Sequence, residues 1–231
     1  MGQPSITEIE AGLNDWDLLK KLPAAVNSFK LVPGTGIKGQ ILNIAAYVND
    51  AIRCRLDIIY TSETFDYVLV KTVGLHTFRD ERYFCRERDK FAGLLLEHLP
   101  DILWDMDRQK LHKMDFEAEG LNFPQWEYWR SLPKKIDNYE LFITPDNPLA
   151  YINGSFIFLD YTDFSNGNQI YFSYNIFRNE IFAEKKQGYL PLTTDVFDVP
   201  ASVRDDRKLA VLADLMQLHL RQEMAELEKI K

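Results

Sequence analysis

The most regular pattern in the chain is the alternation in Ile52-Arg53-Cys54-Arg55-Leu56-Asp57-Ile58. Every second residue is apolar, and the residues between them are charged. Because successive side chains of a β-strand point to opposite faces, this spacing predicts a strand over 51–59 with one buried and one solvated face. The apolar set, which includes Cys54 and Leu56, is expected to face the core.

Two neighbouring stretches extend this strand into a meander. Residues 65–73 are rich in Val, Tyr and Phe, which fit a pleated, half-buried surface, and they predict a second strand. Residues 41–48 suit a strand or a helix, but the turn residues Asn49-Asp50 that follow favour a hairpin. We therefore expect a three-stranded antiparallel meander over 41–73, preceded by a loop at Pro33-Gly34-Thr35-Gly36.

Helical periodicity flanks the meander on both sides. Ser5 and Glu8 form the pattern of a capping box, and the apolar spacing after them predicts a helix over about 6–21, which Pro23 ends. A second helix is expected over about 86–106, with a kink or break at Pro100. Its apolar stripe consists of Phe91, Leu94, Leu95, His98 and Ile102.

The second half of the chain has strands followed by a helix as well. Residues 108–137 predict an irregular, aromatic-rich connection. Strands are expected at 139–144, 149–161, 169–177 and 180–184, with Asn- and Gly-containing turns, and a last helix from Ser202 to about Lys229. The sequence therefore predicts an α+β fold of antiparallel β-meanders with flanking helices, in the order α-βββ-α-linker-ββββ-α.

Length and element order leave the domain organisation open. The chain forms either one continuous domain or two parts, 1–107 and 138–231, joined by the connection over 108–137. Ala46-Tyr47-Val48-Asn49-Asp50 resembles Ala150-Tyr151-Ile152-Asn153-Gly154, and each is followed by strands and a Leu-rich helix containing a His. Two related lobes would explain this likeness, but hairpins recruit the same turn residues by chance, so a duplication stays open.

Composition limits the classes of partner and the compartment. The 231 residues include 27 Lys and Arg against 35 Asp and Glu, for a formal net charge of −8. A nucleic-acid interface needs a basic footprint, so we expect no nucleic-acid partner, and an anionic membrane surface is disfavoured for the same reason. No apolar run approaches the roughly 18 residues of a membrane span. Without a secretory signal pattern, Cys54 and Cys85 are expected to be reduced thiols of a cytoplasmic protein.

His98, Asp101 and Asp105 are the strongest candidates for a metal site. They lie at positions i, i+3 and i+7 of the second expected helix, and imidazole and carboxylate groups on one face could hold a divalent ion. Against this, His98 falls within the apolar stripe, Pro100 interrupts the helix, and aspartates of an acidic protein are usually solvated. These residues belong to the alternative hypothesis of a small hydrolase or metal-dependent enzyme.

Other motifs do not indicate catalysis or a cofactor. Gly34-Thr35-Gly36-Ile37-Lys38-Gly39 fits the dinucleotide pattern G-x-G-x-x-G, but no long buried strand precedes it and no clear helix follows. The sequence contains no Gly-x-Ser-x-Gly nucleophile elbow. We therefore expect no cofactor and assign no catalytic residue.

The aromatic cluster of Trp126, Tyr128 and Trp129 is the candidate binding surface. It lies in the expected irregular connection, and Trp and Tyr are the residue types that dominate binding hot spots. The alternative is that these rings pack over a sheet edge, because large exposed apolar patches are rare on soluble monomers. Our first hypothesis is a non-enzymatic binding or regulatory module that acts through protein–protein or small-ligand contacts.

The last helix suggests a further contact. Its first half, 205–218, is apolar over more than one face, whereas a helix that packs only on its own sheet needs a single stripe. We therefore expect burial on two sides there, against the other lobe, a protein partner or a second copy of the chain. Residues 219–231 carry a narrow apolar seam and are expected to project or to pair weakly.

Overall fold

The computed structural model of the protein describes residues 4–107, 120–151, 154–188 and 190–229. The chain divides into two compact units, which we call unit 1 (residues 1–109) and unit 2 (residues 110–231). Within the described residues, unit 1 has a six-stranded antiparallel sheet and unit 2 a seven-stranded one, each with helices. The predicted α+β fold with antiparallel meanders is confirmed.

The sheet of unit 1 is a simple meander. Its strands follow one another in the order β1-β2-β3-β4-β5-β6. Their bounds are β1 (Ala25–Val26), β2 (Phe29–Lys38), β3 (Ile41–Asn49), β4 (Cys54–Thr61), β5 (Asp66–Val73) and β6 (His76–Arg79). The three expected strands are its centre. The loop expected at Pro33–Gly36 is wrong, because β2 runs through it with an irregular register. β1 pairs only with Phe29 and Lys30, so Pro33 lies on an open edge, where its missing N–H costs no ladder bond.

The alternating pattern of β4 is confirmed, with a later start. Cys54, Leu56 and Ile58 are buried, while Arg55 and Asp57 are partly exposed and form an ion pair at 2.7 Å. The two residues before Cys54 do not join the strand. The side chain of Asn49 accepts a hydrogen bond from the backbone N–H of Ala51, which closes the 3-10 turn η2 (Asp50–Ile52).

The N-terminal helix of unit 1 is broken where one continuous helix was expected. The capping box of Ser5 and Glu8 is present at α1 (Ile6–Gly12), which is followed by η1 (Leu13–Asp15) and α2 (Asp17–Lys21). The break falls at Trp16, whose extended backbone lets its ring reach the core, where it is 3% exposed and lies 5.4 Å from the ring of Tyr67.

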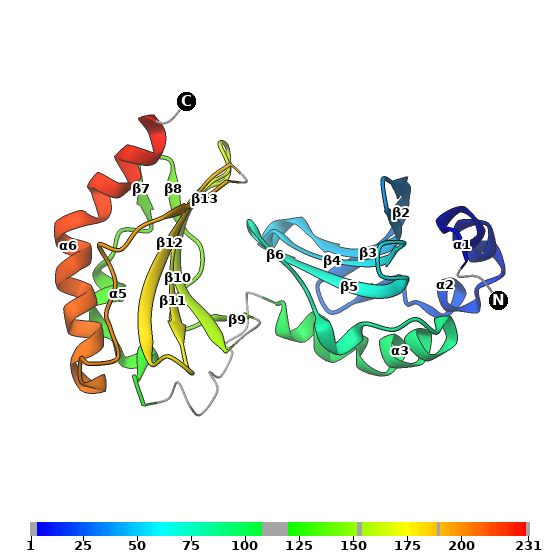
Figure 1. Ribbon diagram of the computed structural model, residues 1–231, viewed down its shortest axis with the longest axis horizontal. Helices are drawn as coiled ribbons and strands as arrows, with labels where there is room; N and C mark the ends of the chain where they lie inside the picture. The colour runs from blue at the N-terminus through cyan, green and yellow to red at the C-terminus, as the bar shows by residue number, and fades with distance from the viewer. Residues whose placement is uncertain (1–3, 108–119, 152–153, 189, 230–231) are drawn as a thin grey trace. The chain divides into compact units, whose positions relative to one another are not determined.

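Helix α3 (Arg88–Asp105) covers one face of the unit 1 sheet (Figure 1). It buries Phe91, Leu95, Leu99, Ile102 and Leu103. The helix was expected here, but the break expected at Pro100 is absent, because Pro100 lies inside a continuous helix. Between β6 and α3 the chain makes the 3-10 turn η3 (Glu81–Tyr83).

The sheet of unit 2 has the order β13-β12-β11-β10-β8-β7, with β9 also paired to β10. The strands are β7 (Lys135–Ile136), β8 (Tyr139–Leu141), β9 (Leu149–Tyr151), β10 (Ser155–Asp163), β11 (Asn168–Asn175), β12 (Glu180–Gln187) and β13 (Leu190–Thr193). The described part of the expected irregular connection is ordered: it holds η4 (Phe123–Gln125), α5 (Glu127–Ser131) and β7. Helices α5 and α6 (Asp205–Lys229) lie on one face of this sheet (Figure 1).

The expectation for the distal half of the last helix is wrong. Leu220, Met224 and Leu227 are 4%, 2% and 1% exposed and belong to the core of unit 2, whereas Leu218 is 72% exposed. Strands of eight or nine residues are about 27 Å long, which matches about 18 residues of helix, so the sheet needs the distal turns as its cover. The narrow seam therefore packs on the protein's own sheet.

Within the described residues, no helix is long and apolar enough to span a membrane.

Replacing Leu56 by Ala is expected to destabilise the protein strongly. Leu56 is fully buried, so the substitution should cost about 2–5 kcal/mol through lost burial and the cavity that remains. Leu190→Ala is the matched control, because Leu190 is 68% exposed and should change stability by less than about 0.5 kcal/mol. Urea denaturation of the full chain measures both. A Leu56→Ala variant as stable as Leu190→Ala would contradict the assigned core face.

Removing residues 221–231 is expected to unfold unit 2, because it deletes the buried Met224 and Leu227 and shortens the cover of the sheet. Removing only residues 228–231, which lie beyond Leu227, should leave the fold intact. Near-UV circular dichroism and thermal melting of both truncated chains test this. If the longer truncation retained a native melting transition for unit 2, the distal turns would be dispensable.

Candidate functional site

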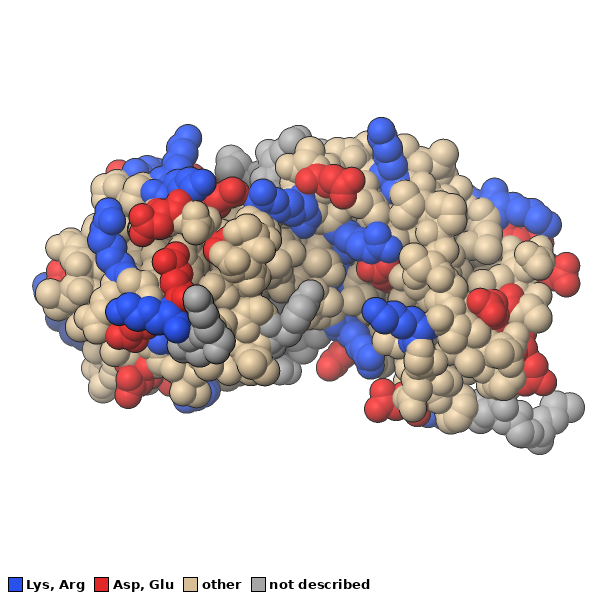
Figure 2. Space-filling view, turned by 90° about the horizontal axis from the view of Figure 1, so that it is seen from above, with Lys and Arg blue, Asp and Glu red and all other residues tan. Residues whose placement is uncertain are grey.

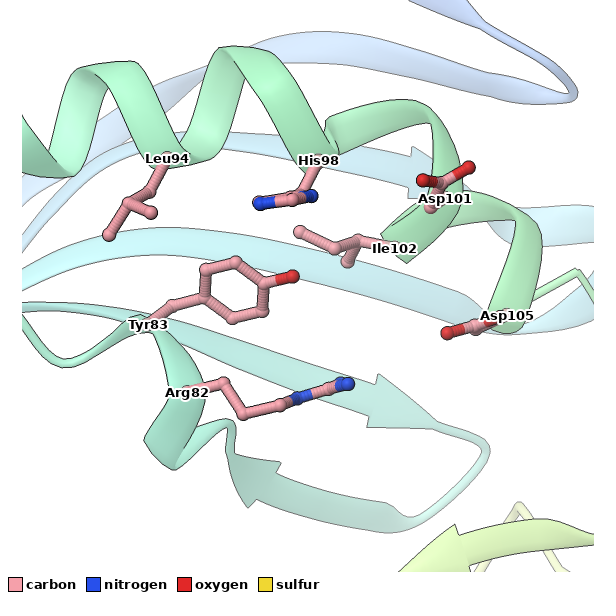
Figure 3. A pocket seen from close by; sticks show the side chains of 7 residues that line it. All are labelled: Arg82, Tyr83, Leu94, His98, Asp101, Ile102 and Asp105. Atoms are coloured by element: carbon pink, nitrogen blue, oxygen red, sulfur yellow. The ribbon is translucent and has the colours of Figure 1, made fainter. Parts of the chain in front are cut away.

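A pocket of about 390 Å³ lies in unit 1 between α3 and η3 (Figure 3). Arg82 and Tyr83 enter it from η3, and the other lining side chains come from α3. The lining residues are Arg82, Tyr83, Leu94, His98, Asp101, Ile102 and Asp105. A larger hollow of about 640 Å³, beside α1, β2 and β3, is lined mainly by apolar residues. A third hollow of about 420 Å³ in unit 1 also gathers charges of both signs, from Asp15, Asp17, Lys21, Arg88 and Asp89. The pocket between α3 and η3 is the candidate site because it contains His98, Asp101 and Asp105 together with an arginine that a buried carboxylate holds in place.

The guanidinium of Arg82 is held in place by a buried carboxylate. Asp80 accepts hydrogen bonds from Nε and Nη2 of Arg82 at 2.9 and 2.8 Å, and from the Arg82 backbone N–H at 3.3 Å. On its other side, Asp80 lies 2.8 Å from Nζ of Lys71, and the side chains of Asp80 and Lys71 are both below 10% exposure. The buried pair thus fixes the backbone of η3 and the direction of the Arg82 side chain.

Asp80 and Arg82 are both charged at neutral pH. Burial alone would raise the pKa of Asp80, but the hydrogen bond from Arg82 and the charge of Lys71 outweigh it and lower this pKa to about 2. The hydrogen bond to Asp80 raises the pKa of Arg82, and the negative charge of Asp105 adds to that increase. The pocket therefore contains a permanent, fixed cation.

Tyr83 and His98 form the inner wall of the pocket. Their rings meet edge to face with centroids 6.1 Å apart, and the Arg82 guanidinium lies 5.6 Å from the centroid of the Tyr83 ring. Burial raises the pKa of Tyr83, Arg82 partly opposes this, and the nearby aspartates increase it further. The Tyr83 hydroxyl therefore remains protonated at neutral pH and is available as a hydrogen-bond donor.

The structure brings His98, Asp101 and Asp105 into this one pocket, as Figure 3 shows. Both aspartates are exposed on α3, one helical turn apart, and His98 is half-buried. Across the described part of the chain, no three His, Cys, Asp or Glu side chains form a group that could hold a metal ion. The pocket also includes Arg82, whose positive charge repels a metal cation.

Arg82 and Tyr83 are the site residues that the sequence did not indicate. They lie in the mixed-charge stretch 79–90, where alternating basic and acidic residues suggest a solvated surface. The spacing of Asp80 and Arg82 was a usable signal, because an aspartate that accepts from the backbone N–H two residues later makes a turn. The burial of Asp80 beside Lys71, which fixes Arg82, depends on the pairing of β5 with β6 and on the cover that α3 provides.

The aromatic cluster lies in unit 2 and is mostly part of its core. Trp126 is 8% exposed, with its ring 6.2 Å from that of Phe158 and 5.7 Å from that of Tyr128. Tyr128 and Trp129 are half-buried and pack against the same core. Trp126 therefore packs inside the unit, and a binding role for Tyr128 and Trp129 stays a prediction.

The glycine motif and the cysteines have structural surroundings. Gly34–Gly39 lies in β2 and the turn to β3, so it does not join a strand to a helix as a dinucleotide site requires. A Cβ at Gly34 would overlap the backbone of Asn43 and Ile44, so the close approach of β3 explains that glycine. Cys54 and Cys85 are both buried thiols.

The face of the molecule in Figure 2 shows no single dominant charge. On the face in Figure 2, basic and acidic side chains are interspersed over each unit. Charge of this kind gives no broad basic footprint on that face.

Comparison with known proteins adds no relative to this picture. No protein-family model matches the chain, and no curated protein or solved structure matches it.

Proposed function

We propose that the protein is a cytoplasmic binding module whose unit 1 pocket takes a small ligand that carries both an anionic and a cationic group. The observation behind this proposal is that a fixed guanidinium and two exposed carboxylates line one pocket of about 390 Å³. A free amino acid is the simplest ligand with this combination of charges.

Arg82 suits the anionic end of such a ligand. A guanidinium has five N–H donors, and Asp80 accepts from only two of its nitrogen atoms, so donors remain for a ligand carboxylate. The Arg82 side chain is 67% exposed, so a ligand can reach it. Because Asp80 already orients the fork, binding would cost less side-chain entropy than binding to a free arginine.

Asp101 and Asp105 suit the cationic end. Both project from α3 at the pocket, and neither is buried (Figure 3). Between the two ends, the Tyr83 hydroxyl and the His98 imidazole offer hydrogen bonds, while Leu94 and Ile102 offer apolar contact. The pocket thus has the mixture of apolar wall and a few directed polar groups that is typical of small-ligand sites.

The lining favours binding over covalent catalysis. None of the seven lining residues is a Ser, Thr, Cys or Lys, so the hydroxyl, thiol and amine nucleophiles that act with an adjacent base or a lowered pKa are missing from the lining, which leaves Tyr83, His98 and the two aspartates. The raised pKa of Tyr83 keeps its hydroxyl protonated, which suits a donor and not a nucleophile. The two buried cysteines are thiols, which is consistent with the proposed cytoplasmic location.

Histidine NMR can test the proposed ligand class directly. We expect at least one of the twenty free L-amino acids, titrated to millimolar concentration, to shift the imidazole resonances of His98 in a saturable way. The resonances of His219 in unit 2 should stay in place. Arg82→Gln should weaken this binding at least tenfold, because it removes a charge-assisted hydrogen bond worth about 1.5–3 kcal/mol. Asp105→Asn should also weaken amino-acid binding.

Arg204→Gln is the matched control, since Arg204 is an 81% exposed arginine of unit 2 that pairs with Asp206. It should bind as the unmodified protein does. The proposal would be contradicted if no amino acid moved the His98 resonances, or if Arg82→Gln bound equally well. Chemical conversion of a bound amino acid during the titration would instead favour the enzyme hypothesis.

A further inference from the structure

The described elements of the two units follow the same path. In unit 1, a short helix (α2) leads into the meander β1 to β6 and then into α3. In unit 2, a short helix (α5) leads into β7, β8 with β9, β10, β11, β12 and β13, and then into α6. The single long strand β2 thus corresponds to β8 and β9, which both pair with β10.

The first segments of the units match residue by residue at a separation of 110 positions (126 − 16 = 110). Trp16 and Trp126 each precede the short helix, and Leu22-Pro23 and Leu132-Pro133 each follow it. Both hairpin turns contain a left-handed residue, Asn27 with φ 52° and Asp137 with φ 51°. These are the same local structures at the same places.

A tyrosine hydrogen bond repeats as well. The hydroxyl of Tyr47 donates to the carbonyl of Pro23 at 2.7 Å, and the hydroxyl of Tyr161 donates to the carbonyl of Pro133, also at 2.7 Å. These tyrosines pair with Leu31 and Leu141, so the register agrees. They are 114 positions apart (161 − 47 = 114), which means that unit 2 has four more residues before this point.

The separation of 114 positions continues through the irregular parts of the meander. The register shifts fall between Asn43 and Ala45 in unit 1 and between Ile157 and Leu159 in unit 2. Three turns have a left-handed residue at matching places: Arg53 and Gly167, Phe65 and Asn179, Gly74 and Gly188. The isolated bridge Tyr67–Cys85 matches the bridge Ile181–Val199.

The long helices match at 121 positions (212 − 91 = 121). In unit 1 the buried positions are Phe91, Leu95, Leu99, Ile102, Leu103 and Met106. The corresponding positions of α6 are all buried: Leu212, Met216, Leu220, Glu223, Met224 and Leu227. The ring pair Tyr83–His98 also matches Phe197–His219, whose centroids lie 6.4 Å apart.

From these matches we infer that the two units are copies of one ancestral unit, in which a buried lysine has kept its place while its carboxylate partner has changed place. A shared meander could arise twice, but common bulges, left-handed residues and a tyrosine–proline hydrogen bond are independent details. The earlier likeness of Ala46–Asp50 to Ala150–Gly154 has the wrong register, because Tyr47 corresponds to Tyr161 and not to Tyr151.

The lysines are Lys71 in β5 and Lys185 in β12, 114 positions apart. Each pairs across the sheet with an equivalent residue, Leu56 or Ile170. Lys71 lies 2.8 Å from Asp80, which precedes η3, whereas Lys185 lies 2.5 Å from Glu223 of α6. The position of Asp80 is Thr194 in unit 2, and the position of Glu223 is Ile102 in unit 1. Thr194 donates to Glu223 at 3.5 Å, so both positions are beside the lysine.

In unit 1 the carboxylate that pairs with the lysine also anchors the pocket, a consequence that rests on the proposed function. Asp80 is both the partner of Lys71 and the anchor of Arg82. In unit 2 the positions of Arg82 and Tyr83 are Val196 and Phe197, so the guanidinium and the hydroxyl are both missing. Of these two equivalent places, the one in unit 1 carries the ligand site, and Asp80 is its positioning residue.

An exchange of carboxylates within unit 2 tests the equivalence without any ligand. Glu223→Ile should lower the urea denaturation midpoint of the full chain, because it leaves Lys185 buried without its partner. Adding Thr194→Asp, which copies the unit 1 arrangement, should recover at least half of that loss. Thr193→Asp in the same background is the matched control and should recover none, since Thr193 is exposed.

The inference is overturned if Thr194→Asp rescues no better than Thr193→Asp. Should Glu223→Ile fail to fold, Glu223→Gln is the milder background for the same comparison. The reverse exchange in unit 1, Asp80→Thr with Ile102→Glu, should be more stable than Asp80→Thr alone but should weaken amino-acid binding at least tenfold. Rescue without binding in the unmodified protein would refute the proposed function and leave the duplication standing.

Discussion

A buried lysine charge between sheet and helix constrains both units. Lys71 and Lys185 are each about nine-tenths buried in the layer that the long helix covers. An ammonium group there is costly unless a carboxylate and further hydrogen bonds satisfy it. In unit 1 the residue after β6 supplies that carboxylate, which sets the position of η3. In unit 2 helix α6 supplies it, which sets the position of α6 over the sheet.

This constraint gives unit 1 both stability and chemistry. Because the pKa of Asp80 in the fold is about 2, below the roughly 3.9 of an unfolded aspartate, the carboxylate stabilises the protein above about pH 4. That contribution is lost as the pH falls through about 2. The same carboxylate orients Arg82, so the residue that pairs with Lys71 also fixes the cation of the pocket. In unit 2 the helix supplies the carboxylate, and the position of Arg82 is an ordinary Val196.

Local sequence signals predicted the regular elements well. The alternation around Leu56, the capping box at Ser5 and the last helix all appear in the structure, because each depends on residues close in sequence. Signals failed where tertiary packing decides. Burial of the Trp16 ring breaks the first helix, and the sheet of unit 2 recruits the distal turns of α6.

The candidate site was only half visible in the sequence for the same reason. His98, Asp101 and Asp105 share a helix face, so their spacing brought them together. Arg82 and Tyr83 join them through the turn after β6, whose path depends on the Lys71–Asp80 pair. The repeat was visible only as a short likeness in the wrong register, because the insertions that shift it from 110 to 114 positions fall inside the meander.

Asp80 is fixed between Lys71 and Arg82, and the geometry of the pocket depends on this contact. Carbon-detected NMR titration of the Asp80 carboxyl group in the unmodified protein measures this most directly. We expect an Asp80 pKa of about 2, set by the hydrogen bond from Arg82 and the charge of Lys71 against the opposing effect of burial. An Asp80 pKa at or above the ordinary value of 3.8 would show that these two cations do not hold the carboxylate.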